Sequence, residues 1–187
     1  MEDMLYEKMI STKIVFQGKI LTIFFDEVEL PDGKITTREK VGHPGAVAIV
    51  PVNENNDIIL VKQYRYPVEK ILVEIPAGKL DYKEPPIECA RRELHEEAGI
   101  INGEMTLLTT IFTTPGFSNE KMDIFLARGF KEIGNNPEHD EFLHVIKVNI
   151  DECIKMIYEG IIMDAKSIIG ILLARNYILK TKNESIK

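Results

Sequence analysis

Short apolar runs of the kind that form β-strands dominate most of the chain. Residues 14–40 alternate β-rich runs with turn residues, and Asp32-Gly33 separates two of these runs, so we expect an antiparallel meander with a hairpin there. Residues 46–52 (AVAIVPV) are almost continuously apolar, which predicts a strand that is buried on both faces. Similar runs predict further strands over residues 57–65, 71–78, 105–115, 121–130 and 142–150.

Three segments carry helix signals. Pro85-Pro86 suits a helix start and Gly99 a C-terminal cap, which predicts a helix of about 13 residues between them. Two more helices are predicted near the end of the chain, with Asp151 and Asp164 as their N-caps. The last helix has apolar residues at helical spacing that we expect in the core or in a subunit contact: Ile168, Ile169, Leu172, Leu173 and Tyr177. We therefore predict an α/β (α+β) fold with helices flanking a mixed sheet.

Length and charge narrow the classes of function. The 187 residues suffice for one main core, and 23 basic against 30 acidic side chains give a net charge of −7 without any basic stripe, so we expect no nucleic-acid partner. The longest apolar run, residues 168–174, is too short to span a bilayer, and the acidic N-terminus is unlike a secretory signal. We expect no membrane partner, a cytoplasmic location and free thiols at Cys89 and Cys153.

The helix that ends before Gly99 concentrates carboxylates. Ile87, Ala90, Leu94 and Ala98 form one stripe, which predicts its buried face. Glu93 and Glu97 are one turn apart with Glu96 beside them, and a partly buried pair of carboxylates ~4 Å apart repels by ~4 kcal/mol at an effective dielectric constant of ~20. A divalent cation removes this penalty, and carboxylate oxygens suit Mg²⁺ or Mn²⁺.

A longer motif surrounds these carboxylates. The stretch matches G-x5-E-x7-R-E-U-x-E-E-x-G-U, where U is an aliphatic residue, at Gly78, Glu84, Arg92, Glu93, Leu94, Glu96, Glu97, Gly99 and Ile100. Seven fixed residue types make a chance match at one start on the order of 10⁻⁸. This motif is the Nudix box, and the chain resembles a Nudix hydrolase. The resemblance implies a Nudix-like α/β/α sandwich over residues 43–187, preceded by the N-terminal meander over residues 1–42.

The resemblance also assigns roles to the residues of the box. Glu93, Glu96 and Glu97 are expected to hold divalent ions, with the backbone carbonyl of Ala77 as a further ligand. Arg92 is expected to pair with Glu84 and to fasten the loop onto the helix, so that the carboxylates are preorganised. In the family, water attacks a phosphorus of a nucleoside diphosphate that is linked to another group.

Two further signals resemble the subgroup that cleaves ADP-ribose. They are VEIPAGKLD (residues 73–81), which leads into the box, and Pro115, sixteen positions after Gly99. Arg38 and Arg65 fit the subgroup's positions for arginines that contact phosphates or the terminal ribose, although either residue can instead be a surface charge. Glu120 is expected to hydrogen-bond the attacking water or a group next to it.

The identity of the catalytic base is left open by the sequence. The family places a glutamate in a loop late in the sheet, as base or as an extra metal ligand, and Glu141 fits that position best. The alternatives are Glu138, His139 and a glutamate of the box, Glu96 among them. We favour Glu141 because its carboxylate is ionised near neutral pH without tuning.

These residues predict a Mg²⁺-dependent ADP-ribose pyrophosphatase that yields AMP and ribose 5-phosphate, with Mn²⁺ as a substitute. The alternatives are a Nudix hydrolase of another nucleotide sugar or dinucleotide, and a nucleotide-sensing domain without turnover. The subgroup uses an N-terminal segment like residues 1–42 to build a homodimer in which each partner completes the other's substrate pocket, so we expect a homodimer here.

Overall fold

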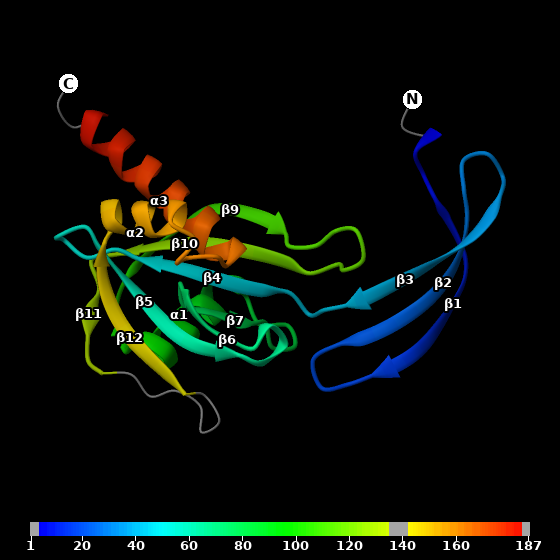
Figure 1. Cartoon of the computed structure of the whole chain (residues 1–187), viewed down its shortest axis with the longest axis horizontal. Coiled ribbons are helices and arrows are strands. Elements are labelled where there is room, and N and C mark those ends of the chain that lie inside the picture. Colours follow the sequence, from blue (N-terminus) through cyan, green and yellow to red (C-terminus); the bar gives the residue numbers. More distant parts are fainter. Residues whose placement is uncertain (1–3, 135–141, 185–187) are drawn as a thin grey trace. The chain divides into compact units, whose positions relative to one another are not determined.

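The structure is a computed structural model that describes residues 4–134 and 142–184 (Figure 1). The chain forms two compact units. The first comprises the N-terminal segment up to Gly45 together with Phe112–Lys121, and the second comprises Ala46–Ile111 together with the chain from Met122 onward.

The first unit is built on a three-stranded antiparallel sheet in the order β1-β2-β3, formed by β1 (Lys8–Gln17), β2 (Thr22–Glu29) and β3 (Ile35–Gly42). The turn between β2 and β3 contains Gly33 with φ 81°, a left-handed conformation that glycine adopts without steric cost. The predicted hairpin at Asp32-Gly33 is therefore confirmed. Strand β1 begins at Lys8, six residues before the β-rich runs that were recognised from residue 14, and each of its residues is exposed.

Within the described residues, the second unit holds three sheets, three α-helices and the short 3-10 helix η2. Its four-stranded sheet has the order β7-β4-β10-β9 with β10 parallel to β4, a three-stranded antiparallel sheet has the order β12-β5-β6, and β11 pairs with β8. The elements are β4 (Ala46–Pro51), β5 (Asp57–Arg65), η2 (Tyr66–Val68), β6 (Lys70–Glu74), β7 (Ala77–Lys79), α1 (Pro86–Ala98), β8 (Ile100–Ile101), β9 (Glu104–Phe112), β10 (Lys121–Arg128), β11 (Lys131–Glu132), β12 (Leu143–Asn149), α2 (Ile150–Tyr158) and α3 (Ala165–Glu184).

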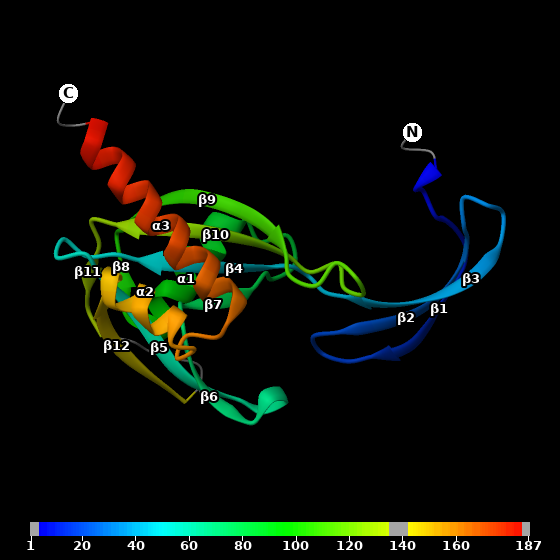
Figure 2. The ribbon, with the colours of Figure 1, turned by 45° about the horizontal axis from the view of Figure 1, so that its top comes forward.

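Strand β4 lies at the centre of this unit, and all six of its residues are buried, as predicted. Because side chains alternate along a strand, Ala48 and Val50 pack in one apolar cluster with residues of α2 and α3, whereas Val47 and Ile49 pack in a second cluster with α1. The two layers of helices therefore lie on opposite sides of the β-sheet layer (Figures 1 and 2). This arrangement confirms the predicted α/β/α sandwich with a mixed sheet.

Local details differ from the sequence predictions at three places. The strand predicted over residues 71–78 is split at Pro76, which has no N–H to donate, so that β6 pairs with β5 and β7 pairs with β4. The N-cap of α2 is Asn149, whose side chain accepts a hydrogen bond from the Asp151 N–H at 3.1 Å, so Asp151 as N-cap was wrong.

The third difference concerns α3. Its predicted apolar stripe is displaced, because Leu172 and Tyr177 are exposed while Ile171, Ala174 and Ile178 are buried. None of the helices within the described residues is long and apolar enough to cross a membrane.

Candidate active site

Helix α1 carries the charged residues of the box on a face that is partly inside the protein. Pro86 occupies the first helical position, and Gly99 ends the helix with φ 65° and donates its N–H to the His95 carbonyl at 2.9 Å. Ala90, Leu94 and Ala98 are buried as predicted, but Ile87 is exposed because it precedes the part of the helix that packs on the sheet. Glu93 and Glu97 are only 8% and 2% exposed.

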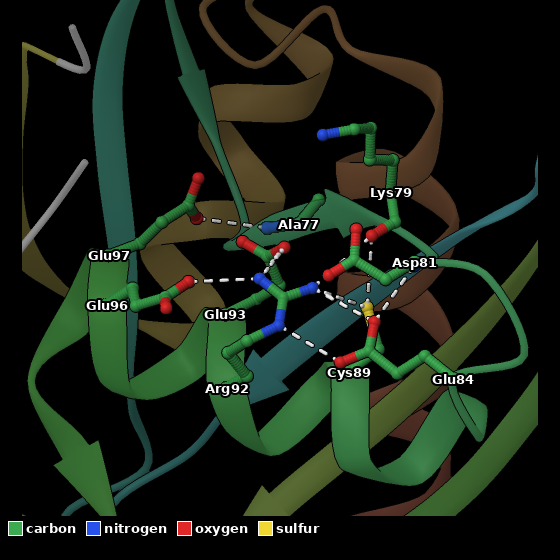
Figure 3. Close-up of polar contacts among 9 residues, drawn as sticks. All are labelled: Ala77, Lys79, Asp81, Glu84, Cys89, Arg92, Glu93, Glu96 and Glu97. Atoms are coloured by element: carbon green, nitrogen blue, oxygen red, sulfur yellow. Dashed lines mark hydrogen bonds and ion pairs between the residues drawn. The ribbon is translucent and has the colours of Figure 1, made fainter. Parts of the chain in front are cut away.

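Arg92 compensates much of this buried negative charge (Figure 3). Its Nε and Nη2 donate to the two carboxylate oxygens of Glu84 at 3.0 and 3.1 Å, so the expected pair is present and is bidentate. The Nη1 nitrogen donates to Glu93 at 2.7 Å and to Glu96 at 3.0 Å. One guanidinium thus fastens the loop before α1 and holds two carboxylates of the helix in place.

The short strand β7 meets the carboxylates from the other side. A Cβ atom at Gly78 would lie 1.9 Å from the carboxylate carbon of Glu93, so only glycine allows this carboxylate to lie against the backbone. The N–H of Ala77 donates to Glu97 at 3.0 Å. Carboxylate oxygens of Glu93 and Glu97 therefore lie against the same strand whose Ala77 carbonyl was predicted as a ligand.

This set of donors fits a hard divalent cation. All the candidate ligands are oxygens, and the carboxylates come from one rigid helix beside one strand. In residues 4–134 and 142–184, no three His, Cys, Asp or Glu side chains stand in metal-binding positions. In this structure Arg92 donates to both Glu93 and Glu96.

The Arg92–Glu84 pair also makes stability depend on pH. Hydrogen bonds from Arg92 lower the pKa of Glu84 from 4.5 to about 2. As the pH falls below about 4.5, the unfolded chain takes up a proton at this carboxylate before the folded chain does, so the free energy of unfolding decreases. The stabilisation is complete above pH 4.5 and is lost progressively toward pH 2.

We therefore expect Glu84→Gln to lower the free energy of unfolding at pH 7 by about 2 kcal/mol, with the difference from wild type shrinking between pH 4.5 and pH 2. Urea unfolding of both chains across this range measures the difference. Glu88→Gln, on the exposed face of α1, is the matched control. A difference that stays constant with pH would contradict the assignment of the low pKa to Glu84.

Arg65 lies in the same unit as the box, at the end of β5. Its Nε and Nη2 donate to the two oxygens of Glu74 at 2.9 and 2.8 Å. The ion pair with Glu74 raises the pKa of Arg65, and the charge of Glu97 acts in the same direction. Arg65 is therefore neither a simple surface charge nor remote from the carboxylates of α1.

The other predicted substrate residues belong to the first unit. Arg38 and Pro115 both line a cavity of about 420 Å³ in that unit, and the Arg38 guanidinium donates to Glu7 at 2.6 and 3.0 Å. Glu120 accepts a hydrogen bond from the Thr113 hydroxyl at 2.6 Å. The structure thus brings Arg38 and Pro115 to one cavity.

The predicted base falls on a part of the chain that the structure does not describe. Glu141 and its alternatives Glu138 and His139 all lie outside the described residues. The assignment of the base to Glu141 stays a prediction.

Sequence reasoning missed a group of charged residues beside Arg65. Glu74 and Lys166 are both buried, and Lys166 contacts Glu74 and Asp164. Asp164 was predicted only as an N-cap, a role that its hydrogen bond from the Ser167 N–H at 3.0 Å confirms. The only signal for Lys166 was its place in the first turn of α3, just before the apolar run of residues 168–174.

Comparisons with known proteins agree with this geometry. The model of the NUDIX domain matches residues 42–160, and the model of the nucleoside diphosphate sugar hydrolase N-terminal domain matches residues 7–41. The chain is 41% identical to an ADP-ribose pyrophosphatase of Bacillus subtilis (strain 168), over 87% of this chain and 89% of the relative. It is 42% identical to a methanol dehydrogenase activator of Bacillus methanolicus, over 88% and 90% of the two chains.

The fold has a counterpart among solved structures. The crystal structure of an ADP compounds hydrolase superposes with a TM-score of 0.84 over 95% of this chain and 97% of that one, at 22% identity. At this identity the similarity supports the fold alone.

Proposed function

The chain belongs to the Nudix hydrolase family, and from this membership we propose that it hydrolyses the pyrophosphate of ADP-ribose to AMP and ribose 5-phosphate. The observation that carries the proposal is the set of three box glutamates, Glu93, Glu96 and Glu97, gathered around Arg92 and β7. A domain that only senses a nucleotide has no need for all three carboxylates. The relatives named ADP-ribose pyrophosphatase favour ADP-ribose among the nucleotide sugars.

Nudix hydrolases generally need a divalent metal, and we propose Mg²⁺ for this chain, with Mn²⁺ as a substitute. The carboxylates of Glu93, Glu96 and Glu97 and the carbonyl of Ala77 would hold it. When bound, the cation supplies positive charge that stabilises the charge developing on the pyrophosphate.

The chain's own residues prepare the reaction around that site. Arg92 fixes the direction of the Glu93 and Glu96 carboxylates, and the Ala77 N–H fixes that of Glu97. Arg65 is proposed to bind a phosphate oxygen, because its guanidinium is held rigidly by Glu74 while its side chain is 39% exposed. Glu141 is proposed to take the proton of the attacking water.

A panel of nucleotides tests the substrate. ADP-ribose, GDP-mannose and a dinucleotide are incubated with the protein and Mg²⁺, and the released nucleoside monophosphates are quantified. We expect the highest kcat/KM for ADP-ribose. A higher value for another member would support the alternative of a different Nudix substrate, and tight binding of ADP-ribose without turnover of any member would support a sensor.

We also propose that the chain forms a homodimer through its first unit. Strand β1 is exposed along its whole length, including the apolar side chains of Met9, Ile14 and Phe16, and it forms one edge of the sheet. Exposed apolar strands at a sheet edge are normally covered in soluble proteins. A second copy of the same unit supplies a matching cover. The cytoplasmic location stays a prediction.

Light scattering is expected to give about twice the chain mass of 21.3 kDa. Ile14→Glu, which places a charge at an exposed apolar position of β1, should shift the protein toward the monomer, whereas Lys13→Gln on the same strand, which changes the net charge by the same amount, serves as the control. Deletion of residues 1–40 should yield a monomer with strongly weakened binding of ADP-ribose. A full-length monomer with full activity at all protein concentrations would contradict the proposal.

A further inference from the structure

Four charged side chains form a connected network at the junction of β5, β6 and the start of α3. Glu74 is 1% exposed and the Lys166 side chain 10% exposed, which makes them two of the few charged residues inside the second unit. Lys166 Nζ donates to Glu74 and lies 3.0 Å from Asp164, while Arg65 binds both oxygens of Glu74. Two cations and two carboxylates balance one another.

Glu74 is the shared member of this network. Its Oε2 atom accepts from both Lys166 and Arg65 Nη2, and its Oε1 atom accepts from Arg65 Nε. Burial raises the pKa of Glu74, but the bonds and charges of Arg65 and Lys166 outweigh burial and keep the pKa below its usual value. The carboxylate is therefore ionised, and its direction is fixed from two sides.

The first turn of α3 is joined to the backbone next to Glu74. The Ser167 hydroxyl accepts from the Ile75 N–H at 2.9 Å and donates to Asp164 at 2.6 Å. Ser167 is fully buried, so these bonds are shielded from water. The same turn of helix that presents Lys166 thus holds the strand segment that carries Glu74 and leads to Ala77.

We propose that Lys166 is a positioning residue, which fixes the guanidinium of Arg65 through Glu74 so that Arg65 can bind a phosphate of the substrate. The proposal rests on the proposed function. Glu74 engages Nε and Nη2 of Arg65, and within the described residues Nη1 makes no hydrogen bond, so it could meet a phosphate oxygen. A buried carboxylate with only one cation could follow Arg65 as it moves, whereas a carboxylate that is also held by Lys166 cannot.

A purely structural ion pair would give a different result from a positioning one. Removing one partner of a buried pair lowers stability in either case. If Lys166 acts by positioning Arg65, its replacement raises KM only while the planar guanidinium of Arg65 is present. Arg65→Lys keeps the charge and removes that planar geometry, so in this background the replacement of Lys166 should have little further effect on KM. A double-mutant cycle on these two residues separates the alternatives.

The test compares wild type, Lys166→Met, Arg65→Lys and the double variant, with kcat and KM for ADP-ribose measured at a temperature at which circular dichroism shows all four folded. We expect each single change to raise KM about tenfold with a smaller effect on kcat. The KM of the double variant should be about the same as that of the more impaired single variant. Lys166→Arg, which keeps the charge, should restore KM to within about threefold of wild type. Lys155→Met, at an exposed lysine of α2, should leave both constants unchanged.

An increase in KM in the double variant equal to the product of the two single increases would overturn the proposal. A Lys166→Met variant with a lower Tm but the wild-type KM would also overturn it. If Lys166→Met does not fold, Lys166→Gln replaces it in the same cycle, with the same two outcomes. If wild type hydrolyses ADP-ribose but the effects of the two substitutions on KM are independent, this proposal is overturned and the proposed function is not. A wild type that neither binds nor hydrolyses ADP-ribose overturns the proposed function and this inference with it.

Discussion

Glu97→Gln is expected to remove nearly all turnover of ADP-ribose while the chain stays folded. The substitution keeps the volume of a side chain that is 2% exposed, and the amide oxygen can still accept the hydrogen bond from the Ala77 N–H. What is lost is the negative charge of a proposed metal ligand. If charge stabilisation by the metal dominates, the barrier rises by several kcal/mol, which lowers kcat by about 10³-fold or more.

The measurement is kcat at saturating ADP-ribose and matched Mg²⁺, together with thermal unfolding. Glu88→Gln is the matched control, because Glu88 lies on the same helix with an exposed side chain, and it should keep kcat within about twofold. Activity of Glu97→Gln within about threefold of wild type would contradict the assignment of Glu97 to the metal.

Arg92→Lys is expected to have the second largest effect. Arg92 makes four hydrogen bonds to Glu84, Glu93 and Glu96, and a lysine keeps the charge but cannot reach all three carboxylates with one ammonium group. The buried Glu93 then loses the hydrogen bond from Arg92. We expect kcat/KM to fall by about 100-fold and the free energy of unfolding by about 2 kcal/mol, which lowers Tm by about 4–8 °C.

Arg91→Lys is the control for this substitution. Arg91 is the neighbouring arginine, and its closest carboxylate, that of Glu88, lies 3.9 Å away on the exposed face of α1. It should leave kcat/KM and Tm close to wild type. Equal effects of Arg91→Lys and Arg92→Lys on kcat/KM and Tm would contradict the proposed role of Arg92.

The parts of the structure that the sequence predicted correctly depend on local spacing. Helix α1 was predicted from Pro86 and Gly99, and the Nudix resemblance came from residues that are close together in the chain. Strand β4 was recognised as buried on both faces because its apolar residues are continuous. The contact between Arg92 and Glu84 spans eight residues and followed from the same motif.

The parts that were missed depend on contacts between distant segments. Lys166 and Glu74 are 92 positions apart, and no spacing rule connects a lysine at the start of a helix with a glutamate at the end of a strand. The buried stripe of α3 was displaced because the sheet, and not the helix's own pattern, decides which side packs inward. Arg65 could not be distinguished from a surface charge for another reason: its bonds to Glu74 join two paired strands, and no motif predicted them.

Product analysis with and without a metal ion tests directly whether the chain is a metal-dependent ADP-ribose pyrophosphatase. The full-length chain is incubated with ADP-ribose, with Mg²⁺ and separately with a chelator in place of the metal, and the products are separated by chromatography and identified by mass. We expect AMP and ribose 5-phosphate in equal amounts with Mg²⁺, and neither product with the chelator. Intact ADP-ribose in the presence of both Mg²⁺ and Mn²⁺, or the same rate of cleavage with the chelator, would contradict it.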